Sequence, residues 1–278
     1  MSLKAILDGD MYCYAAADQT VFTVVKHGEM ICCQTDVGEA WINYHKRTDA
    51  LADALDIDPE IDLIHCFTKK GMFRRDLEPN YKANRTQPKP LGYSELKAKC
   101  VDLPWAVMHE QVEADDLIGI FATQFSRENQ DTCIVSGDKD LLQIPGYHYW
   151  HEPFWHSKTK QPLREWLTSF GMEEFTPNLF KVSPEAAERF FYCQILTGDS
   201  IDGISGCPGM GMVGATKEVG KWDITEPVEC WERIVCLYAK KGLSEDEAIK
   251  QARLVRILRD SEYDLTTSTV ELWTPPKS

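Results

Sequence analysis

Residues 112–140 read VEADDLIGIFATQFSRENQDTCIVSGDKD, and this stretch decides the fold. Apolar residues recur at helical spacing from Leu117 to Phe125, which predicts a helix that begins near Glu113. Polar residues then interrupt the pattern, and the sequence TCIVS at 132–136 is typical of a short buried strand. The stretch therefore reads as a helix, a loop and a strand, which is the repeating unit of an α/β protein.

Two pairs of carboxylates lie at the ends of these elements. Glu113 and Asp115 stand where the helix begins, beside free backbone N–H groups and the positive end of the helix dipole. Asp138 and Asp140 follow the C-terminal end of the strand. Four carboxylates at adjacent junctions would resist ionisation unless cations neutralised them, and hard divalent cations prefer such oxygen ligands. An acidic helix cap and a solvated loop would explain either pair alone. The choice between these explanations and a metal site therefore depends on the chain's other acids.

The elements before this stretch alternate between strands and helices. The predicted strands lie at about 4–8, 62–67 and 105–109, and the predicted helices at 11–17, 36–55 and 93–101. This alternation predicts a mostly parallel central sheet with helices on both faces. Ligands of such sheets bind beyond the C-terminal ends of the strands, where Asp8 joins the four carboxylates named above.

The C-terminal part is predicted to be helical. Ser183, which is followed by proline, is a favourable N-cap for a helix that ends near Thr197. Two later helical stretches follow, the second ending near Asp260, and a short strand is expected at 270–273. The chain is therefore expected to divide into a core, residues 1–182, and a helical region, residues 183–278.

Two stretches have no functional prediction. Residues 21–33 are expected to form a hairpin that turns at His27 and Gly28. Residues 147–182 are rich in Trp, Phe and His but lack clear periodicity, so no element or role is assigned to them.

The composition is that of a soluble globular protein. The chain has 278 residues, of which 43% are hydrophobic and 27% charged. No apolar run approaches the ~20 residues of a membrane span, and the N-terminus lacks the apolar region of a signal peptide. The ten cysteines form no CxxC pair and no zinc-binding spacing. We therefore expect reduced thiols in a cytoplasmic protein without a membrane partner.

The net charge of −14 is unevenly distributed. Residues 69–99 contain nine Lys and Arg against three acids, a net charge of +6 that leaves −20 for the rest of the chain. This basic segment could be a solvated face, but its charge also suits contact with phosphates.

The third acidic pair lies in the second half of the chain. Asp199 and Asp202 follow the helix that starts after Ser183. Together with the earlier acids they could hold two divalent cations, which can clamp the attacking and leaving oxygens of an in-line phosphoryl displacement.

A glycine motif, Gly209-x-Gly211-x-x-Gly214, follows the third acidic pair. It has the spacing of a dinucleotide fingerprint, but it follows a helix and a loop instead of a strand. Its backbone could bind a phosphate or a monovalent cation, and a tight turn between packed helices explains it equally well.

Six motifs occur in the order found in the flap endonuclease / 5′–3′ exonuclease family, which the chain resembles over residues 4–217. The motifs are Asp8-Gly-Asp10, Tyr81-Lys82-x-Asn84-Arg85, Val112-Glu-Ala-Asp-Asp116, Ser136-Gly-Asp-Lys-Asp140, Gly198-Asp-x-x-Asp202 and Gly209-x-Gly-x-x-Gly214. Further details, such as Pro79–Arg85 and Ala252–Arg259, look most like the exonucleases of short-tailed phages.

This resemblance implies a fold, an activity and a setting. The fold would add a helical arch at about 69–99 and a helix-hairpin-helix element at about 183–220. The activity would be metal-dependent hydrolysis of DNA, and of RNA–DNA hybrids, from 5′ ends or at 5′ flaps. It would use two Mg²⁺ or Mn²⁺ ions and would serve phage DNA replication and degradation in the host cytoplasm.

The resemblance also implies residue roles. The first metal site would be formed by Asp8, Glu113, Asp115 and Asp138, and the second by Asp138, Asp140, Asp199 and Asp202. Lys82 and Arg85 would reach the scissile phosphate from the arch, although an exposed polar loop is the simpler interpretation of both. The remaining residues implied to contact DNA are Lys69, Arg74, Tyr81 (stacked on a base), Lys217, and Gly209, Gly211 and Gly214 (through a bound K⁺).

One departure and two alternatives remain open. Lys69 stands where relatives often carry Asp, and we predict that it points outward to DNA, because a buried ammonium beside metal ions is hard to keep charged. Asp8-x-Asp10 after a strand also resembles the nucleophile motif of haloacid-dehalogenase-like phosphohydrolases. A non-catalytic DNA-binding module that lost its chemistry at Lys69 is the second alternative.

Overall fold

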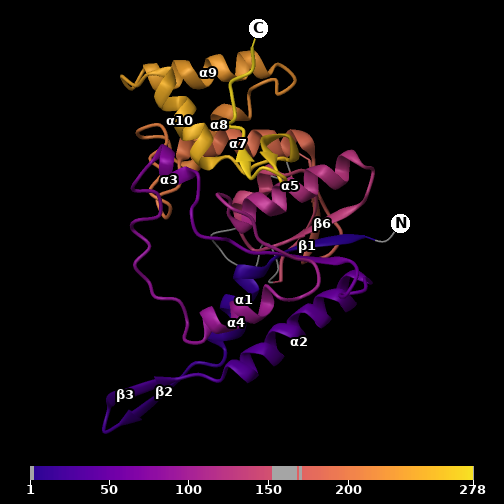
Figure 1. The fold of residues 1–278 in the computed structure, drawn as a ribbon. Coiled ribbons are helices and arrows are strands. Elements are labelled where there is room, and N and C mark those ends of the chain that lie inside the picture. The colour runs from indigo at the N-terminus through magenta and orange to yellow at the C-terminus, as the bar shows by residue number, and fades with distance from the viewer. Residues whose placement is uncertain (1–2, 152–167, 169–170, 278) are drawn as a thin grey trace.

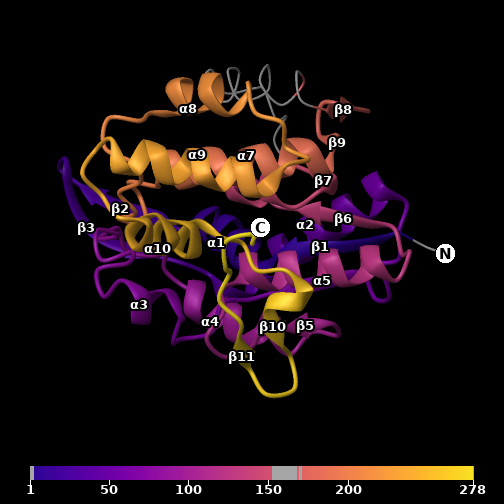
Figure 2. The ribbon, with the colours of Figure 1, turned by 90° about the horizontal axis from the view of Figure 1, so that it is seen from above.

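A seven-stranded sheet forms the centre of the protein in the computed structural model, which describes residues 3–151, 168 and 171–277 (Figure 1). The strands in spatial order are β5 (Ala106–Val107), β4 (Leu63–Cys66), β1 (Lys4–Asp8), β6 (Thr132–Val135), β7 (Gly146–Tyr149), β9 (Leu179–Val182) and β8 (Met172–Glu174). The first five pair in parallel, and β9 and β8 pair antiparallel (Figure 2). This confirms the predicted mostly parallel sheet.

Helices cover both faces of this sheet. The helices up to the centre of the chain are α1 (Gly9–Asp18), α2 (Val37–Leu55), α3 (Arg74–Leu77), α4 (Tyr93–Cys100) and α5 (Ala114–Arg127). Because side chains of a strand alternate between faces, Ala5 and Leu7 of β1 pack against α1, α2 and α4, while Ile6 packs against α5. In Figure 1, α2 and α4 accordingly lie below the sheet and α5 lies above it.

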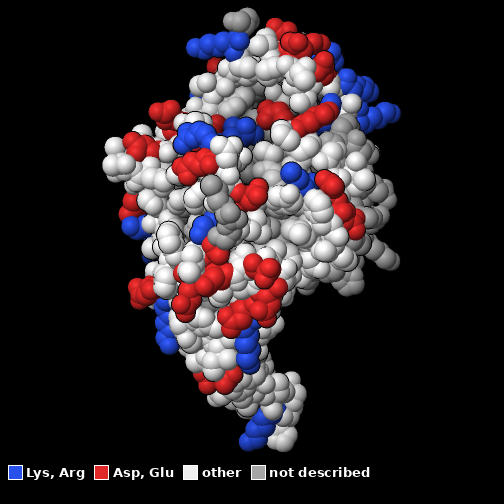
Figure 3. All heavy atoms as spheres, turned by 90° about the vertical axis from the view of Figure 1, so that its right-hand side faces the viewer, with Lys and Arg blue, Asp and Glu red and all other residues white. Residues whose placement is uncertain are grey.

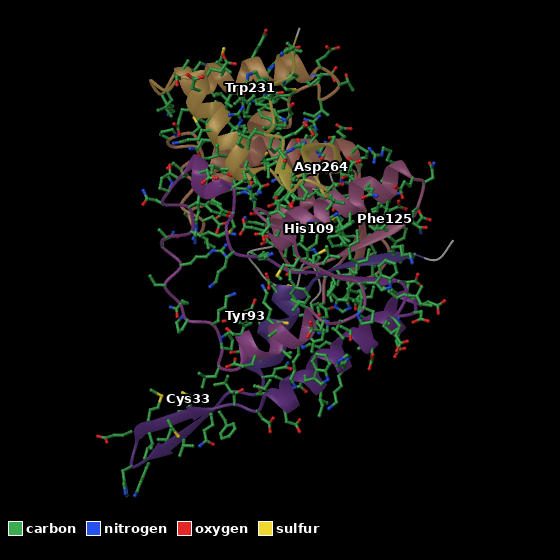
Figure 4. The ribbon with its side chains drawn as sticks, in the orientation of Figure 1. Cys33, Tyr93, His109, Phe125, Trp231 and Asp264 are labelled. Atoms are coloured by element: carbon green, nitrogen blue, oxygen red, sulfur yellow. The ribbon has the colours of Figure 1, made fainter. Side chains whose placement is uncertain are left out.

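The C-terminal helices share a second hydrophobic core. They are α7 (Pro184–Thr197), α8 (Met212–Val219), α9 (Pro227–Ala239) and α10 (Glu245–Val255). Trp231 of α9, labelled in Figure 4, packs edge-on against Trp273 near the C-terminus. Ser183 caps α7 through the backbone N–H of Ala186 at 3.1 Å, as its position before Pro184 predicted.

Two predicted boundaries near the C-terminus are wrong. The helix expected to end near Asp260 ends at Val255, because Ile257 and Leu258 leave it to pack against α5. The short 3₁₀ helix η2 (Asp260–Glu262) comes next. The terminal strand is β11 (Thr269–Val270), which pairs with β10 (Tyr263–Asp264) instead of spanning 270–273.

The hairpin predicted at 21–33 is confirmed. Strands β2 (Phe22–Lys26) and β3 (Glu29–Gln34) pair antiparallel around His27 and Gly28. Both turn residues have positive φ (55° and 82°), as hairpin turns that follow the strand twist require. The hairpin, marked by Cys33 in Figure 4, projects from the body of the molecule, and its surface is largely uncharged in Figure 3.

The basic segment 69–99 is helical only near its ends. It contains α3 and α4, and between them the chain runs through turns and extended backbone (Figure 1). Pro79, Pro88 and Pro90 lie in this middle part, where each removes a backbone donor. The expected arch is therefore an open segment flanked by two short helices.

The stretch 147–182 supplies sheet strands that the sequence did not reveal. Its described residues contain β8, β9 and most of β7, which extend the sheet beyond β6. Residues 152–167 and 169–170 lie outside the described part of the chain. Within the described residues, no helix is both long enough and apolar enough to cross a membrane.

Candidate active site

One cavity of about 1010 Å³ collects the predicted acids at the C-terminal ends of β1 and β6. Its lining includes the seven carboxylates expected to bind metal: Asp8, Glu113, Asp115, Asp138, Asp140, Asp199 and Asp202. They come from β1, the start of α5, the 3₁₀ helix η1 (Lys139–Gln143) and the loop after α7. The structure thus brings together acids that are spread over almost 200 residues of sequence.

Asp8, Asp115 and Asp138 influence one another electrostatically in this cavity, where Asp8 is buried and the other two are partly buried. Asp8 ends β1 and caps α1 by accepting from the Met11 N–H at 2.9 Å, while Ser136 Oγ donates to its other oxygen at 3.2 Å. Burial, together with the charges of Asp10 and Asp138, raises the pKa of Asp8 to about 7. Burial and the charges of Asp138 and Asp8 likewise raise the pKa of Asp115 well above its usual range. These groups repel one another, as ligands of a multivalent cation do before it binds.

A second group of acids is paired with Lys139. The Lys139 ammonium donates to Asp140 at 2.7 Å and to Asp199 at 3.0 Å. Burial raises the pKa of Asp140 to about 6, aided by the charge of Asp138 and opposed by Lys139. Burial would also raise the pKa of Asp199, but Lys139 and the backbone N–H groups of Ile201 and Asp202 hold it below its usual value.

Glu113 is surrounded by basic and hydroxyl groups. It accepts from Lys82, from Arg74 at 3.2 Å and from the Tyr81 hydroxyl at 2.8 Å. Burial alone would raise the pKa of Glu113, but the cations of Arg74 and Lys82 outweigh it and hold the pKa below its usual value. Glu113 is therefore ionised and fully engaged in this structure.

Lys82 and Arg85 reach into the cavity from the open part of the basic segment. Lys82 pairs with Glu113 and lies 3.5 Å from Asp202, and Arg85 pairs with Asp202. The Lys82 side chain is only 13% exposed, so the interpretation as an exposed polar loop is wrong for it, whereas half of the Arg85 side chain is exposed. Both act here as counterions of the acids that were predicted to bind metal.

Two residues predicted to contact DNA are buried instead. The Tyr81 ring is buried and its hydroxyl is bound to Glu113, so Tyr81 is not free to stack on a base. Arg74 is also buried, and its guanidinium forms a bidentate ion pair with Asp116, with hydrogen bonds of 2.6 and 2.7 Å. Its remaining donors reach Glu113 and two backbone carbonyls, so none is left for a phosphate. Neither side chain is free to contact DNA in this structure.

Lys69 points away from the acids. It pairs with Glu110, its side chain is 42% exposed, and it is not part of the cavity lining. This position fits the predicted outward orientation.

Asp10 also lines the cavity, and three donors hold its carboxylate. Lys97, the Tyr93 hydroxyl (2.8 Å; Tyr93 is labelled in Figure 4) and the Thr68 N–H (2.9 Å) all donate to its carboxylate. Asp10 therefore anchors α4 and the end of β4 to α1.

The glycine motif lies on an exposed turn between α7 and α8. Gly209 has a positive φ of 78°, Gly211 is the N-cap of α8, and Gly214 lies inside that helix. All three glycines and Lys217 are exposed, so the glycine backbone and the Lys217 side chain can reach a partner. This arrangement does not decide between a phosphate and a monovalent cation as that partner.

The donor set fits divalent cations, although the acids do not yet converge on one point. In the described part of the chain, no three acidic, His or Cys side chains stand together as metal ligands. Lys82, Arg85 and Lys139 form ion pairs with four of them, Glu113, Asp140, Asp199 and Asp202. Binding of metal would therefore require these cations to move, while the crowded, largely buried carboxylates supply the oxygen ligands that hard cations prefer.

The sequence did not single out Lys139 or Tyr14. Lys139 lies between two predicted ligands in the chain, and that position was the signal that could have revealed it.

Tyr14 lies on α1 at the cavity with 47% of its surface exposed, and it follows Asp8 by less than two helical turns. An exposed aromatic ring on a carboxylate-lined cavity is a candidate for contact with a base.

Comparisons with known proteins identify the family. The model of the 5′–3′ exonuclease N-terminal, resolvase-like domain matches residues 5–159. The exodeoxyribonuclease of Enterobacteria phage T3 is 27% identical over 97% of this chain and 92% of that protein. The exonuclease of Escherichia phage T7 is also 27% identical, over 97% of this chain and 93% of that protein. The bacteriophage T5 D15 flap endonuclease shares the fold, with a TM-score of 0.60 and 15% identity over 92% of this chain and 89% of that one.

These matches overturn both alternatives. A haloacid-dehalogenase-like phosphohydrolase would not match this family, and Asp10 is in any case held by three donors. A non-catalytic module is contradicted by relatives named as exonucleases over nearly their whole length. The chain belongs to the 5′–3′ exonuclease family and is a 5′–3′ DNA nuclease.

Proposed function

We propose that the protein hydrolyses DNA phosphodiesters from 5′ ends and at 5′ flaps with two Mg²⁺ or Mn²⁺ ions. The observation that carries this proposal is the single cavity into which seven carboxylates and the basic side chains of Lys82 and Arg85 project. The T5 D15 structure is described as a pseudo-enzyme–product complex with DNA and metal ions, which supports a DNA substrate and metal dependence for this chain.

The carboxylates divide into two ligand groups in this proposal. The first ion would be held by Asp8, Glu113, Asp115 and Asp138, and the second by Asp138, Asp140, Asp199 and Asp202. Asp138 belongs to both groups because it lies at the end of β6, between the two sets of acids. When bound, the two cations supply electrostatic stabilisation of the attacking and leaving oxygens.

Lys82 and Arg85 would exchange partners when DNA binds. Burial favours the neutral amine of Lys82, but Glu113 and Asp202 raise its pKa above the usual value, so it carries its charge to the substrate. If Glu113 and Asp202 held divalent cations, Lys82 and Arg85 would be free to bind the phosphate beside the cut. Their place on the open segment between α3 and α4 favours such movement.

Duplex DNA would be gripped away from the cavity. We assign this contact to the exposed glycine turn, Gly209, Gly211 and Gly214, with a K⁺ ion on its carbonyls, and to Lys217 on α8. Lys69 would add a contact at the edge of the basic segment. Tyr14 takes the stacking role that the burial of Tyr81 excludes, because its ring is exposed at the cavity.

The wider assignments rest on the relatives. The relatives from phages T3 and T7 favour a role in phage DNA replication and degradation within the host cytoplasm. The proposed substrates also include RNA–DNA hybrids. In this proposal, residues 1–182 form the nuclease core with the basic segment, and residues 183–278 contain a helix-hairpin-helix element at about 183–220.

A cleavage assay tests the proposal. The protein is incubated with 5′-labelled blunt duplex, 5′-flap DNA and an RNA–DNA hybrid in EDTA or in increasing Mg²⁺. We expect short labelled products only with the metal, and a rate that rises with more than the first power of Mg²⁺ concentration below saturation. Cleavage in EDTA, or products released only from 3′ ends, would contradict the proposed function.

A further inference from the structure

Lys139 connects two acids of the proposed second metal site, and the inference drawn from it rests on that proposed site. Its ammonium donates to Asp140 Oδ1 at 2.7 Å and to Asp199 Oδ2 at 3.0 Å. Asp140 lies on η1 after β6, while Asp199 lies on the loop after α7. One basic side chain thus bridges carboxylates that lie 59 positions apart in the sequence.

The hydrogen bonds of Asp199 show which oxygen the ammonium occupies. Asp199 Oδ1 accepts from the backbone N–H of Ile201 at 2.8 Å and of Asp202 at 3.3 Å, and so it holds the loop in shape. Lys139 takes Oδ2, the oxygen that the loop does not use. A cation could bind Asp199 through Oδ2 without breaking the loop, but only after the ammonium has left.

Asp140 is held in a similar way. Its Oδ1 accepts from Lys139 and also from Gln194 Nε2 at 2.7 Å, a donor that lies on α7. Removal of the ammonium would leave Gln194 in place to orient the carboxylate. The position of Asp140 therefore does not depend on Lys139 alone.

Lys139 has room to move its side chain but not its backbone. The side chain is 43% exposed and lines both the main cavity and a neighbouring one beside the loop after α7. Its backbone follows β6 directly, in a turn that Asp138 caps through the Asp140 N–H at 2.9 Å. Lys82 and Arg85 belong to the open basic segment, whereas Lys139 stays beside the acids wherever that segment moves.

We propose that Lys139 is a resident competitor of the second divalent cation and weakens that site until its ammonium is displaced. A cation that binds Asp140 and Asp199 must first break both contacts of Lys139, which lowers its observed affinity. Among the described contacts Lys139 reaches neither Asp8 nor Asp115, so the first site is spared. After a reduction for its partial exposure, a unit charge this close changes the dissociation constant by roughly tenfold.

Metal titration without DNA tests this inference directly. Mn²⁺ is titrated calorimetrically into metal-free wild-type protein, Lys139→Met and Lys139→Arg. We expect Lys139→Met to lower the Kd of the weaker site roughly tenfold and to leave the tighter site within about twofold. Lys139→Arg keeps the charge and should keep the weak site. Lys221→Met is the matched control, because it removes an ion pair with Glu218 (3.0 Å) outside the cavity.

A second measurement keeps the test valid if Lys139→Met is less stable. The unfolding temperature of each protein is measured in EDTA and in saturating Mn²⁺. The increase caused by Mn²⁺ should be larger in Lys139→Met than in the wild type, because only the variant lacks an internal counterion for Asp140 and Asp199. An equal increase in both proteins would overturn the inference.

The outcomes separate this inference from the proposed function. An unchanged Kd of the weaker site in Lys139→Met, equal tightening of both sites, or a single Mn²⁺ per chain would overturn the role of Lys139. Two bound Mn²⁺ ions with the expected shift, but no cleavage of 5′-labelled DNA by the wild type, would support Lys139 and refute the proposed nuclease mechanism.

Discussion

Replacing Arg74 by Met should destabilise the fold without weakening DNA binding. Arg74 was expected to contact DNA, but its guanidinium is buried between α3, α5 and the C-terminal end of α10. It pairs with Asp116 through two hydrogen bonds and also donates to Glu113 and to the carbonyls of Leu254 and Arg256. Methionine preserves most of the volume and removes every one of these donors.

The size of the effect follows from what remains after the substitution. Asp116 is completely buried, and without Arg74 its charge keeps only the backbone N–H groups of Glu113 and Leu258. Breaking a buried ion pair by removing one partner costs about 3–5 kcal/mol of unfolding free energy. At about 2–4 °C per kcal/mol for a chain of this size, the unfolding temperature should fall by roughly 6–20 °C.

Urea denaturation and DNA binding measure the two sides of this prediction. Arg75→Met is the matched control, because Arg75 is the neighbouring residue and is exposed. The control should change the unfolding free energy by less than about 0.5 kcal/mol. A loss of less than about 1 kcal/mol in Arg74→Met would refute the structural role. If Arg74→Met instead kept its stability but bound DNA more weakly, with a salt slope lower by about one, the result would support a contact between Arg74 and DNA.

Four further predictions concern the cavity and its surroundings. Asp138→Asn should lower the cleavage rate by several orders of magnitude and preserve DNA binding in Ca²⁺, and a rate above about a tenth of the wild type would contradict its shared position between the ions. Lys82→Ala should reduce the single-turnover cleavage rate more than the affinity for duplex DNA, and Gly211→Glu should reduce the affinity more than the rate. Equal effects on rate and affinity in both variants would refute the division between a catalytic Lys82 and a DNA-binding glycine turn. Lys69→Asp should leave the Mg²⁺ midpoint unchanged and lower DNA affinity, with a salt slope smaller by roughly one, whereas a lower Mg²⁺ midpoint would place Lys69 toward the metals. Burial and nearby acids raise the pKa of Asp8 to about 7 in the folded state, so its contribution to stability is present below its unfolded pKa and is lost as pH rises through 7. The metal-free protein should therefore lose stability between about pH 4 and 7, and Asp8→Asn should reduce this loss.

Local sequence patterns predicted the elements that hold the acids. Ser183 caps α7, as its position before the helical pattern indicated. Asp36, the first residue of the helix predicted over 36–55, caps α2 through the backbone N–H groups of Gly38 and Glu39. The strand ends at Asp8 and near Asp138 could be predicted because short apolar runs end there in polar residues. Because the C-terminal ends of parallel strands lie on the same side of a sheet, the carboxylates could be predicted to lie near one another without known distances.

Contacts between distant residues explain what the sequence left out. Nothing local distinguishes the buried Arg74 from the exposed Arg75, because the difference arises from Asp116, which lies 42 residues later. Tyr81 is buried for a similar reason, since its hydroxyl partner Glu113 is the N-cap of α5, 32 residues later. The strands after Tyr147 escaped prediction because β9 pairs antiparallel with β7, and the paired residues lie 30 to 36 positions apart.

The charges of the cavity favour the binding of divalent cations. Eight carboxylates line it, the seven predicted ligands and Asp10, together with six Lys and Arg side chains. Four of these basic side chains, Arg74, Lys82, Arg85 and Lys139, pair directly with predicted ligands. The lining therefore keeps an excess of negative charge when all eight acids are ionised, and hard divalent cations suit such a set of oxygen ligands. Burial and the repulsion between neighbouring acids raise the pKa values of Asp8, Asp115 and Asp140, and a bound divalent cation would offset both effects.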